Sequence, residues 1–371
     1  MSGLLTPIAI ERPAEIRFGA GLAREVGTFV RARGYVRPLV VSDPFNANRI
    51  EVLGLPGNPV VFGTVRPEPD IPNLDALLAL AEASEPDVVI GFGGGSAMDL
   101  AKLAAVLPGS GQSIHDVVGP EKVADRRLGL IQVPTTSGTG SEAGTRSLVT
   151  DPATQNKLAV QSRHMLADLA LVDPHLTLTV PPAVTAATGV DAMAHCTEAY
   201  TSRKAHPLID LYALEGIRLV GRYLPRAVRD GADREARAGL ALASLYGGFC
   251  LGPVNTTAGH AVAYPLGTRH HIPHGLACAL IFAHTLAFNA SAVPEKTGHV
   301  LEALGARPHV LDGAREFCAG LGIDMRLSAH GVPESDLDTM ATDAHAIRRL
   351  LDNNPRDMSR DDILALYRAA L

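Results

Sequence analysis

Residues 88–102 read Val88-Val-Ile-Gly-Phe-Gly-Gly-Gly-Ser-Ala-Met-Asp-Leu-Ala-Lys102, and this stretch decides the fold class. Val88–Phe92 is a continuous apolar run, which is typical of a strand buried on both faces of a parallel sheet. The residues that follow the glycines, Ala97–Val106, have the composition of a helix. A buried strand, a glycine-rich turn and a helix in this order predict an α/β domain, with a parallel sheet flanked by helices.

The glycine turn is a candidate phosphate-binding site. Gly93, Gly94 and Gly95 allow backbone N–H groups to approach an anion without a Cβ in the way. The helix N-terminus adds partial positive charge, and Ser96 could cap the helix or donate to a phosphate. Asp99 either compensates the helix dipole or accepts a hydrogen bond from a ribose hydroxyl. The spacing fits neither the usual dinucleotide fingerprint nor a P-loop, so a tight turn without a ligand is the alternative.

The same alternation of short apolar runs and helical stretches extends over residues 1–180. The predicted strands are Leu39–Ser42, Val60–Phe62 and Leu128–Val133, with a helix at Leu74–Ala83 and a small opening hairpin made of Ile8–Ile10 and Glu15–Phe18. These elements predict further βαβ units of the same parallel sheet.

After about residue 180 the β-branched strands give way to Ala- and Leu-rich runs. The predicted helices are Leu208–Tyr223, Arg234–Phe249, Gly275–Phe288, Val310–Leu321, Ala341–Leu351 and Arg360–Leu371. Val180-Pro181-Pro182 is a natural boundary, because proline cannot continue a helix and restricts the residue before it. We therefore expect an α/β domain over residues 1–180 and an all-α domain over residues 181–371.

Two further polar stretches follow predicted strands. Pro134-Thr-Thr-Ser-Gly-Thr-Gly-Ser-Glu142 offers five hydroxyl groups, which either contact a cofactor or include the cap of a helix beginning near Ser141. Asp43 ends the first long strand, where a carboxylate can bind an adenosine ribose and repel a 2′-phosphate. A simple Asp-Pro turn is the alternative for Asp43.

A candidate metal site begins at Asp191 and His195. They stand four apart in a run of helical composition, so they share one helix face. His260 and His274 lie downstream, and one carboxylate with three imidazoles suits a divalent metal such as Fe²⁺ or Zn²⁺. The chain has 14 histidines, so chance spacing must be weighed. The histidine pair at 270–271 leaves the fourth ligand open on spacing alone.

Composition limits the function classes. The net charge is −6, aromatic residues make up 4% and tryptophan is absent, which argues against a nucleic-acid partner. The four cysteines are far apart and predict free thiols in a reducing compartment. No signal peptide or transmembrane run is evident, so we expect no membrane partner and a cytoplasmic location.

Motifs along nearly the whole chain resemble those of the iron-containing (group III) alcohol dehydrogenase family. The resembling stretches are Gly93–Lys102, Pro134–Glu142, Ala187–His195, His260–Gly267, Ile272–Gly275 and Asn354–Arg356. The resemblance implies a dehydroquinate-synthase-like fold. It has an NAD-binding α/β domain, a helical domain that binds metal and substrate, and a catalytic metal in the cleft between them.

The resemblance also implies roles for single residues. The metal ligands are Asp191, His195, His260 and His274, so it selects His274 over its neighbours. The cofactor contacts are Asp43, Gly93, Gly94, Gly95, Ser96, Asp99, Thr135, Thr136, Thr139 and Lys157. Acidic Asp43 suggests NAD over NADP, and the implied metal is Fe²⁺, with Zn²⁺ as the alternative.

Two positions depart from the family pattern. Tyr264 stands where many members have a histidine that is a candidate proton relay, so Tyr264 or His271 could take that role beside His260. Glu68, between Pro67 and Pro69, stands where members often carry asparagine, which could alter the adenosine pocket.

The implied activity is hydride transfer between NAD(H) and a small alcohol, aldehyde or ketone, in an enzyme expected to be a homodimer. The alternatives are a hydroxy-acid dehydrogenase, a hydroxyacid–oxoacid transhydrogenase of the 4-hydroxybutyrate type, and an enzyme like maleylacetate reductase. A non-catalytic scaffold predicts eroded ligands or glycines, and none is eroded here.

Overall fold

The computed structural model describes residues 3–371. Its internal contacts divide the described chain into two compact units. One, the α/β unit, comprises residues 11–136 and 140–178. The other, the helical unit, comprises the remaining described residues, chiefly 179–371.

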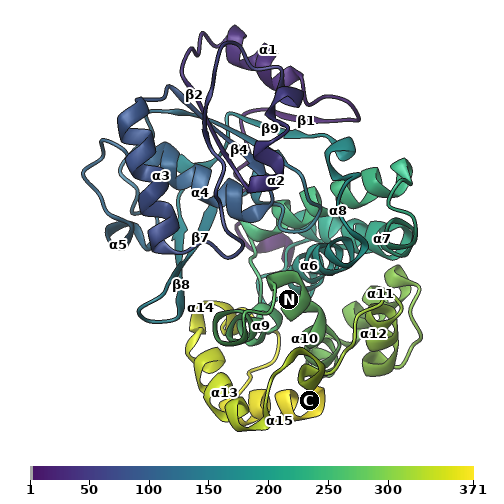
Figure 1. Ribbon diagram of the computed structural model, residues 1–371. Helices are drawn as coiled ribbons and strands as arrows, with labels where there is room; N and C mark the ends of the chain where they lie inside the picture. Colours follow the sequence, from purple (N-terminus) through teal and green to yellow (C-terminus); the bar gives the residue numbers. More distant parts are fainter. Residues whose placement is uncertain (1–2) are drawn as a thin grey trace. The chain divides into compact units, whose positions relative to one another are not determined.

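The α/β unit is built on a six-stranded sheet with the order β1-β9-β6-β4-β2-β3. Figure 1 labels β1, β2, β4 and β9 of this sheet. Its strands are β1 Ile16–Phe18, β2 Pro38–Ser42, β3 Val60–Phe62, β4 Val88–Gly93, β6 Gly129–Pro134 and β9 Leu169–Val172. Every neighbouring pair is parallel, so the predicted parallel sheet is confirmed.

Helices cover both faces of this sheet. They are α1 Glu25–Ala32, α2 Pro44–Ala47, α3 Ile71–Ser84, α4 Gly95–Val106 and α5 Ile114–Val117. Val89 of β4 packs in one apolar cluster with Leu74 of α3 and Leu100 of α4, whereas Ile90 packs in a second cluster with Phe29 of α1. Successive strand residues point to opposite faces, so burial on both faces explains why β4 is apolar throughout.

A second, three-stranded sheet has the order β5-β8-β7 and was not predicted. Its strands are β5 Gly119–Pro120, β7 Arg146–Asp151 and β8 Asn156–Gln161, of which β7 and β8 form an antiparallel hairpin. The predicted opening hairpin is wrong, because β1 pairs in parallel with the distant β9 and residues 8–10 form no strand. Both errors concern short, partly exposed strands whose partners local pattern does not reveal.

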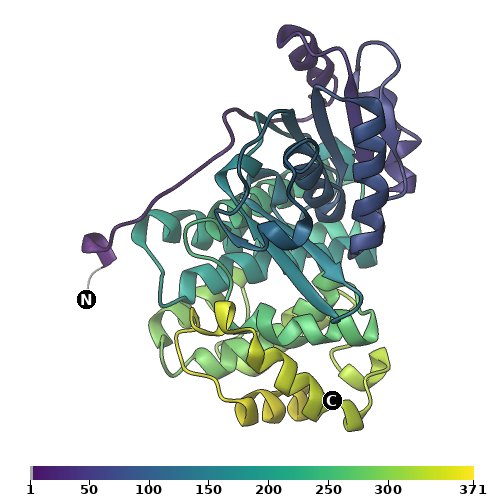
Figure 2. The same ribbon diagram turned by 90° about the vertical axis from the view of Figure 1, so that its left-hand side faces the viewer.

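The helical unit carries no strand over residues 179–371. Figure 2 shows this part of the chain as helices coloured from teal through green to yellow. Its helices are α6 Pro182–Thr201, α7 Pro207–Arg229, α8 Arg234–Leu251, α9 Ala258–His270, α10 His274–Asn289, α11 Pro294–Leu304, α12 Val310–Ala319, α13 Leu337–Ala346, α14 Arg348–Leu351 and α15 Arg360–Ala370. One apolar core joins them. The predicted helix at Ala341–Leu351 is divided at Ile347 between α13 and α14.

Short 3-10 turns complete the described structure. They are η1 Gly3–Leu5, η2 Ile50–Leu53, η3 Ser141–Ala143, η4 Arg163–Met165, η5 Pro174–Thr177, η6 Leu327–His330 and η7 Glu334–Asp336. Among residues 3–371, no helix has the length and apolar character needed to cross a membrane.

Candidate metal centre and nucleotide loop

Helix α6 supplies the first two candidate ligands. Pro182 stands in its first turn, where the missing N–H costs nothing, and from Gly189 onward every residue of the helix is buried. Asp191 and His195 are one helical turn apart on the same face, as their spacing predicts.

Two further helices bring in the other histidines. His260 lies in the first turn of α9, and His274 is the first residue of α10. Gly275 allows α10 to lie against α6, because a Cβ at this position would stand 2.4 Å from the carbonyl oxygen of Ala187. The glycine after His274 therefore helps to place that imidazole beside α6.

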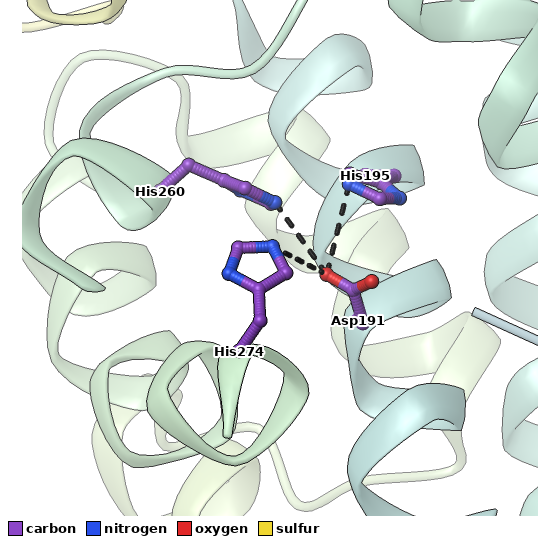
Figure 3. Close-up of side chains that lie close together, drawn as sticks. All are labelled: Asp191, His195, His260 and His274. Atoms are coloured by element: carbon purple, nitrogen blue, oxygen red, sulfur yellow. Dashed lines mark ion pairs between the residues drawn. The ribbon is translucent and has the colours of Figure 1, made fainter. Parts of the chain in front are cut away.

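The four side chains converge on one point (Figure 3). The Nε2 atoms of His195, His260 and His274 lie 3.6, 3.5 and 3.5 Å from Oδ1 of Asp191. One ligand atom from each residue lies within 4.8 Å of all the others. The His274 side chain is 20% exposed, so the cluster reaches solvent at this corner, whereas the other three residues are buried.

The cluster contains polar atoms that nothing in the described residues satisfies. Among residues 3–371, Oδ1 of Asp191 and Nε2 of His260 have no hydrogen-bond partner, although both atoms are buried. Buried polar atoms are almost always paired, so such an arrangement calls for a cation. Metal bonds of about 2.1 Å in tetrahedral geometry separate ligand atoms by roughly 3.4 Å, close to the spacing observed here. The residues therefore fit a divalent transition metal.

Two of the four clustered residues already have the protonation state that a metal ligand needs. Burial raises the pKa of the Asp191 carboxyl, but the surrounding imidazoles lower it by more, so it lies below its ordinary value. Burial lowers the pKa of His195 to about 4. Asp191 is therefore ionised and His195 neutral at neutral pH. Burial lowers the pKa of His260, but Cys278 and Glu198 raise it well above its ordinary value, so ligation there must displace a proton.

Sequence reasoning missed two side chains beside the cluster. Glu198 accepts a 2.6 Å hydrogen bond from Nδ1 of His260, and Sγ of Cys278 lies 3.8 Å from Nε2 of His274. Their helical spacing could have signalled both: Glu198 lies three residues after His195 on α6, and Cys278 lies four after His274 on α10.

The two predicted relay residues lie in different settings. Tyr264 is buried on α9, with its ring centroid 5.9 Å from that of His274 and 6.4 Å from that of His260. His271 is exposed, ends α9 with a φ of 55°, and is not part of the four-residue cluster. The neighbouring His270 lies instead 3.5 Å from Oδ2 of Asp336.

The predicted phosphate-binding turn lies between β4 and α4. Gly94 is the residue before the helix, with a φ of −76°, and Gly95 and Ser96 form its first turn. A Cβ on Gly93 would stand 2.8 Å from Cβ of Ala97 and 3.0 Å from Oδ2 of Asp43. The structure therefore brings Asp43 beside the glycine turn, because β2 and β4 are neighbouring strands whose carboxyl ends meet at one edge.

Both predicted acidic contacts already accept hydrogen bonds. Asp43 caps α2 by accepting from the backbone N–H groups of Phe45 and Asn46, each at 3.0 Å. Asp99 accepts from the Ser141 hydroxyl at 2.6 Å and from the backbone N–H of Leu148 at 2.9 Å. Asp43 therefore caps α2, and Asp99 links α4 to the loop after β6 and to β7.

The remaining predicted cofactor contacts are distributed around the same turn. Thr136 faces Gly94, with its Oγ1 3.4 Å from where a Cβ would lie. Thr135 accepts a 3.1 Å hydrogen bond from the Asn46 side chain. Lys157 forms an ion pair with Glu68.

The loop after β6 has two further features. Thr139 belongs by its contacts to the helical unit. The alternative that this loop caps a helix near Ser141 is wrong, because only the 3-10 turn η3 follows, and Gly140 before it provides no side-chain cap.

Comparison with known proteins identifies the family of the chain. The pattern of the family described as iron-containing alcohol dehydrogenase matches residues 13–174, and that of the Fe-containing alcohol dehydrogenase family, C-terminal, matches residues 185–371. Long-chain-alcohol dehydrogenase 1 of Geobacillus thermodenitrificans is 38% identical over 323 residues, covering 84% of this chain and 81% of its own.

Two solved structures have the same fold over almost the whole chain. An alcohol dehydrogenase from Oenococcus oeni superposes with a TM-score of 0.92 at 29% identity, covering 98% of this chain and 100% of its own. A sulfoacetaldehyde reductase from Bifidobacterium kashiwanohense, in complex with NAD⁺, superposes with a TM-score of 0.89 at 30% identity, covering 98% and 99%. This chain therefore belongs to the iron-containing alcohol dehydrogenase family, whose members are oxidoreductases that act on CH–OH groups.

Proposed function

We propose that the chain is an NAD-dependent alcohol dehydrogenase whose catalytic divalent metal, Fe²⁺ or Zn²⁺, is held by Asp191, His195, His260 and His274. One observation carries the metal site: a buried carboxylate oxygen faces three imidazole nitrogens at 3.5–3.6 Å without a hydrogen bond that satisfies it. An O/N₃ donor set of this kind suits either metal.

The bound metal and cofactor would supply one part of the chemistry, and the protein residues would supply the other. A bound metal supplies Lewis acidity that lowers the pKa of an alcohol hydroxyl, and nicotinamide supplies the hydride acceptor. Asp191 and His195 contribute an anionic oxygen and a neutral nitrogen from the buried part of one helix. The partly exposed edge of His274 leaves a side from which a small substrate can approach. Of the two relay candidates, we favour Tyr264, because it is buried beside the cluster whereas His271 is exposed.

The cofactor proposal rests on the turn between β4 and α4. Backbone N–H groups at Gly94–Ser96 open the 12-residue helix α4, an arrangement that suits a pyrophosphate. The Asp43 carboxylate beside this turn disfavours a 2′-phosphate, which supports NAD over NADP. Lys157 is already ion-paired with Glu68, so its charge is offset before any nucleotide arrives.

We also propose a substrate class, an oligomeric state and a cellular location. The substrate is a small alcohol, aldehyde or ketone, which a panel of alcohols and hydroxy acids assayed with NAD would identify. A homodimer is proposed from the prevalence of two-fold symmetric enzymes. A cytoplasmic location is proposed because all four cysteines are free and buried, as in proteins of reducing compartments.

Metal analysis tests the centre directly. Protein purified without chelator is expected to contain about one transition-metal ion per chain, because four preformed donors hold it. Chelation is expected to abolish activity, and added Fe²⁺ or Zn²⁺ to restore it. Elemental analysis and turnover measured on the same samples provide the check. Metal-free protein with full activity would contradict the proposal.

Asp43→Asn is expected to reduce the preference for NAD over NADP by roughly fivefold, since one repulsive charge near the 2′-phosphate is worth about 1 kcal/mol in a solvated site. Asparagine can still cap α2, so the fold is retained. Asp70→Asn is the matched control, because Asp70 caps α3 by accepting from the backbone N–H of Asn73 at 2.9 Å. The kcat/KM ratio for the two cofactors is the measurement. An unchanged ratio in Asp43→Asn would show that Asp43 is a turn residue only.

A further inference from the structure

Helix α6 presents a third polar residue on the face that carries Asp191 and His195. Glu198 follows His195 by three positions and is only 7% exposed. It is not one of the four clustered donors. A buried carboxylate is costly unless it is hydrogen-bonded, so its partners indicate what it does.

The partners of Glu198 all lie in one short segment at the start of α9. Its Oε1 accepts from Nδ1 of His260 at 2.6 Å. Its Oε2 accepts from the backbone N–H of Thr257 at 2.6 Å, from the Thr257 hydroxyl at 3.1 Å and from the backbone N–H of His260 at 3.3 Å. Thr257 precedes α9 without capping it through its own side chain, so Glu198 of α6 satisfies the first turn of α9 in its place.

The bond to Nδ1 decides which nitrogen of His260 can act as a ligand. Oε2 of Glu198 already accepts from two backbone N–H groups and the Thr257 hydroxyl, and hydrogen bonds of this kind stabilise the carboxylate form, which can only accept. Nδ1 must then carry a proton. When the ring is neutral, as a metal ligand must be, its lone pair therefore stands on Nε2, the atom that lies 3.5 Å from Oδ1 of Asp191.

We infer that Glu198 is the positioning residue of the metal centre, setting the tautomer and ring orientation of His260. This inference rests on the proposed function, in which His260 is a ligand. Carboxylate partners of ligand imidazoles raise ligand basicity and fix ring orientation, and losing one commonly costs 10- to 100-fold in metal affinity. Because Glu198 shares α6 with Asp191 and His195, one carboxylate ties the ligand pair of that helix to the ligand of α9.

The close packing of Gly259 against Glu198 supports this role independently. A Cβ at position 259 would stand 2.6 Å from Oε1 of Glu198 and 2.9 Å from its Cδ. Any side chain there would displace the carboxylate from Nδ1 of His260. Gly259→Ala therefore perturbs the same contact without altering a candidate ligand or Glu198.

The test measures Co²⁺ affinity, with Co²⁺ as the metal probe for the full chain. Glu198→Ala is expected to weaken binding by about 100-fold, and Glu198→Gln and Gly259→Ala by about 10-fold, while the visible spectrum of the Co²⁺ form changes. Tyr367→Phe is the matched control, because the buried Tyr367 hydroxyl donates to the Val262 carbonyl of α9 at 2.6 Å and lies outside the cluster. Should Glu198→Ala fail to fold, Glu198→Gln and Gly259→Ala decide the question. Affinity within threefold of wild type in the folded variants would overturn the inference.

A second readout separates this inference from the proposed function. In the metal-free protein, the hydrogen-bonded Nδ1 proton of His260 should give a low-field NMR resonance coupled to an imidazole nitrogen, and Glu198→Ala should lose it. If the wild-type chain binds no Co²⁺, the proposed function fails. In that case the NMR resonance alone tests the role of Glu198. A resonance that is present in the wild type and lost in Glu198→Ala shows that Glu198 orients His260. Its absence from the wild type overturns that role.

Discussion

His260→Ala is expected to lower kcat by roughly 10³-fold or more, because Lewis-acid assistance is worth several kcal/mol and each 1.4 kcal/mol is about tenfold in rate. The substitution removes a nitrogen 3.5 Å from Oδ1 of Asp191 and also leaves the buried Glu198 without its imidazole partner. A buried charge that loses its partner is destabilising, so the melting temperature should fall as well.

NADH binding separates the loss of chemistry from general damage. His260 belongs to the helical unit and the glycine turn to the α/β unit, so NADH binding, followed by nicotinamide fluorescence, should be largely retained in His260→Ala. His270→Ala is the matched control, since that nearby histidine contacts Asp336 and is not one of the four clustered residues. Retained turnover in His260→Ala would show that the metal is not the Lewis acid.

Gly94→Ala is expected to lower kcat/KM for NAD by roughly 100-fold while leaving the fold intact, because a small displacement of the bound cofactor is enough to misplace the reacting atoms. The fold does not require glycine at this position. Its φ is −76°, and a Cβ would make only ordinary contacts with Thr136, at 3.4 and 3.8 Å. A close approach of the backbone to a phosphate would require it.

The neighbouring glycines show why Gly94 is the informative choice. A Cβ at Gly93 would press on Cβ of Ala97 at 2.8 Å, so that position is restricted by packing alone. Gly298→Ala in α11 is the control, because nothing lies within 4 Å of a Cβ there. Thermal melting and NADH affinity are the two measurements. Wild-type NADH affinity in a folded Gly94→Ala protein would show that the turn does not hold the cofactor.

Local pattern was sufficient for the central elements of both units. The apolar run at Val88–Phe92 predicts a strand buried on both faces, and β4 spans Val88–Gly93 with helices on either side. The hairpin of β7 and β8 escaped prediction because its residues are partly exposed and it is flanked by loops rather than by a repeating helical pattern. The opening strand was given the wrong partner, since β1 pairs with residues more than 150 positions away.

By itself, the sequence determined the fold class and one pair of the metal centre. The spacing of Asp191 and His195 implies a shared helix face, because a helix repeats its geometry every 3.6 residues. Spacing alone left several histidines around position 271 equivalent. The resemblance to a known family selects His274, and the tertiary structure supplies the physical reason: it places His274 in the cluster, His270 beside Asp336, and His271 in an exposed position.

Tertiary structure alone also decided how the centre is held. Glu198 lies 62 positions from His260, yet packing of α6 against α9 brings the carboxylate to 2.6 Å from Nδ1. Contacts over such separations depend on how helices pack, and helix packing depends on small residues such as Gly259 and Gly275 that carry no chemical signal of their own. Sequence periodicity therefore predicts which side chains share a helix face, and three-dimensional packing determines which faces meet.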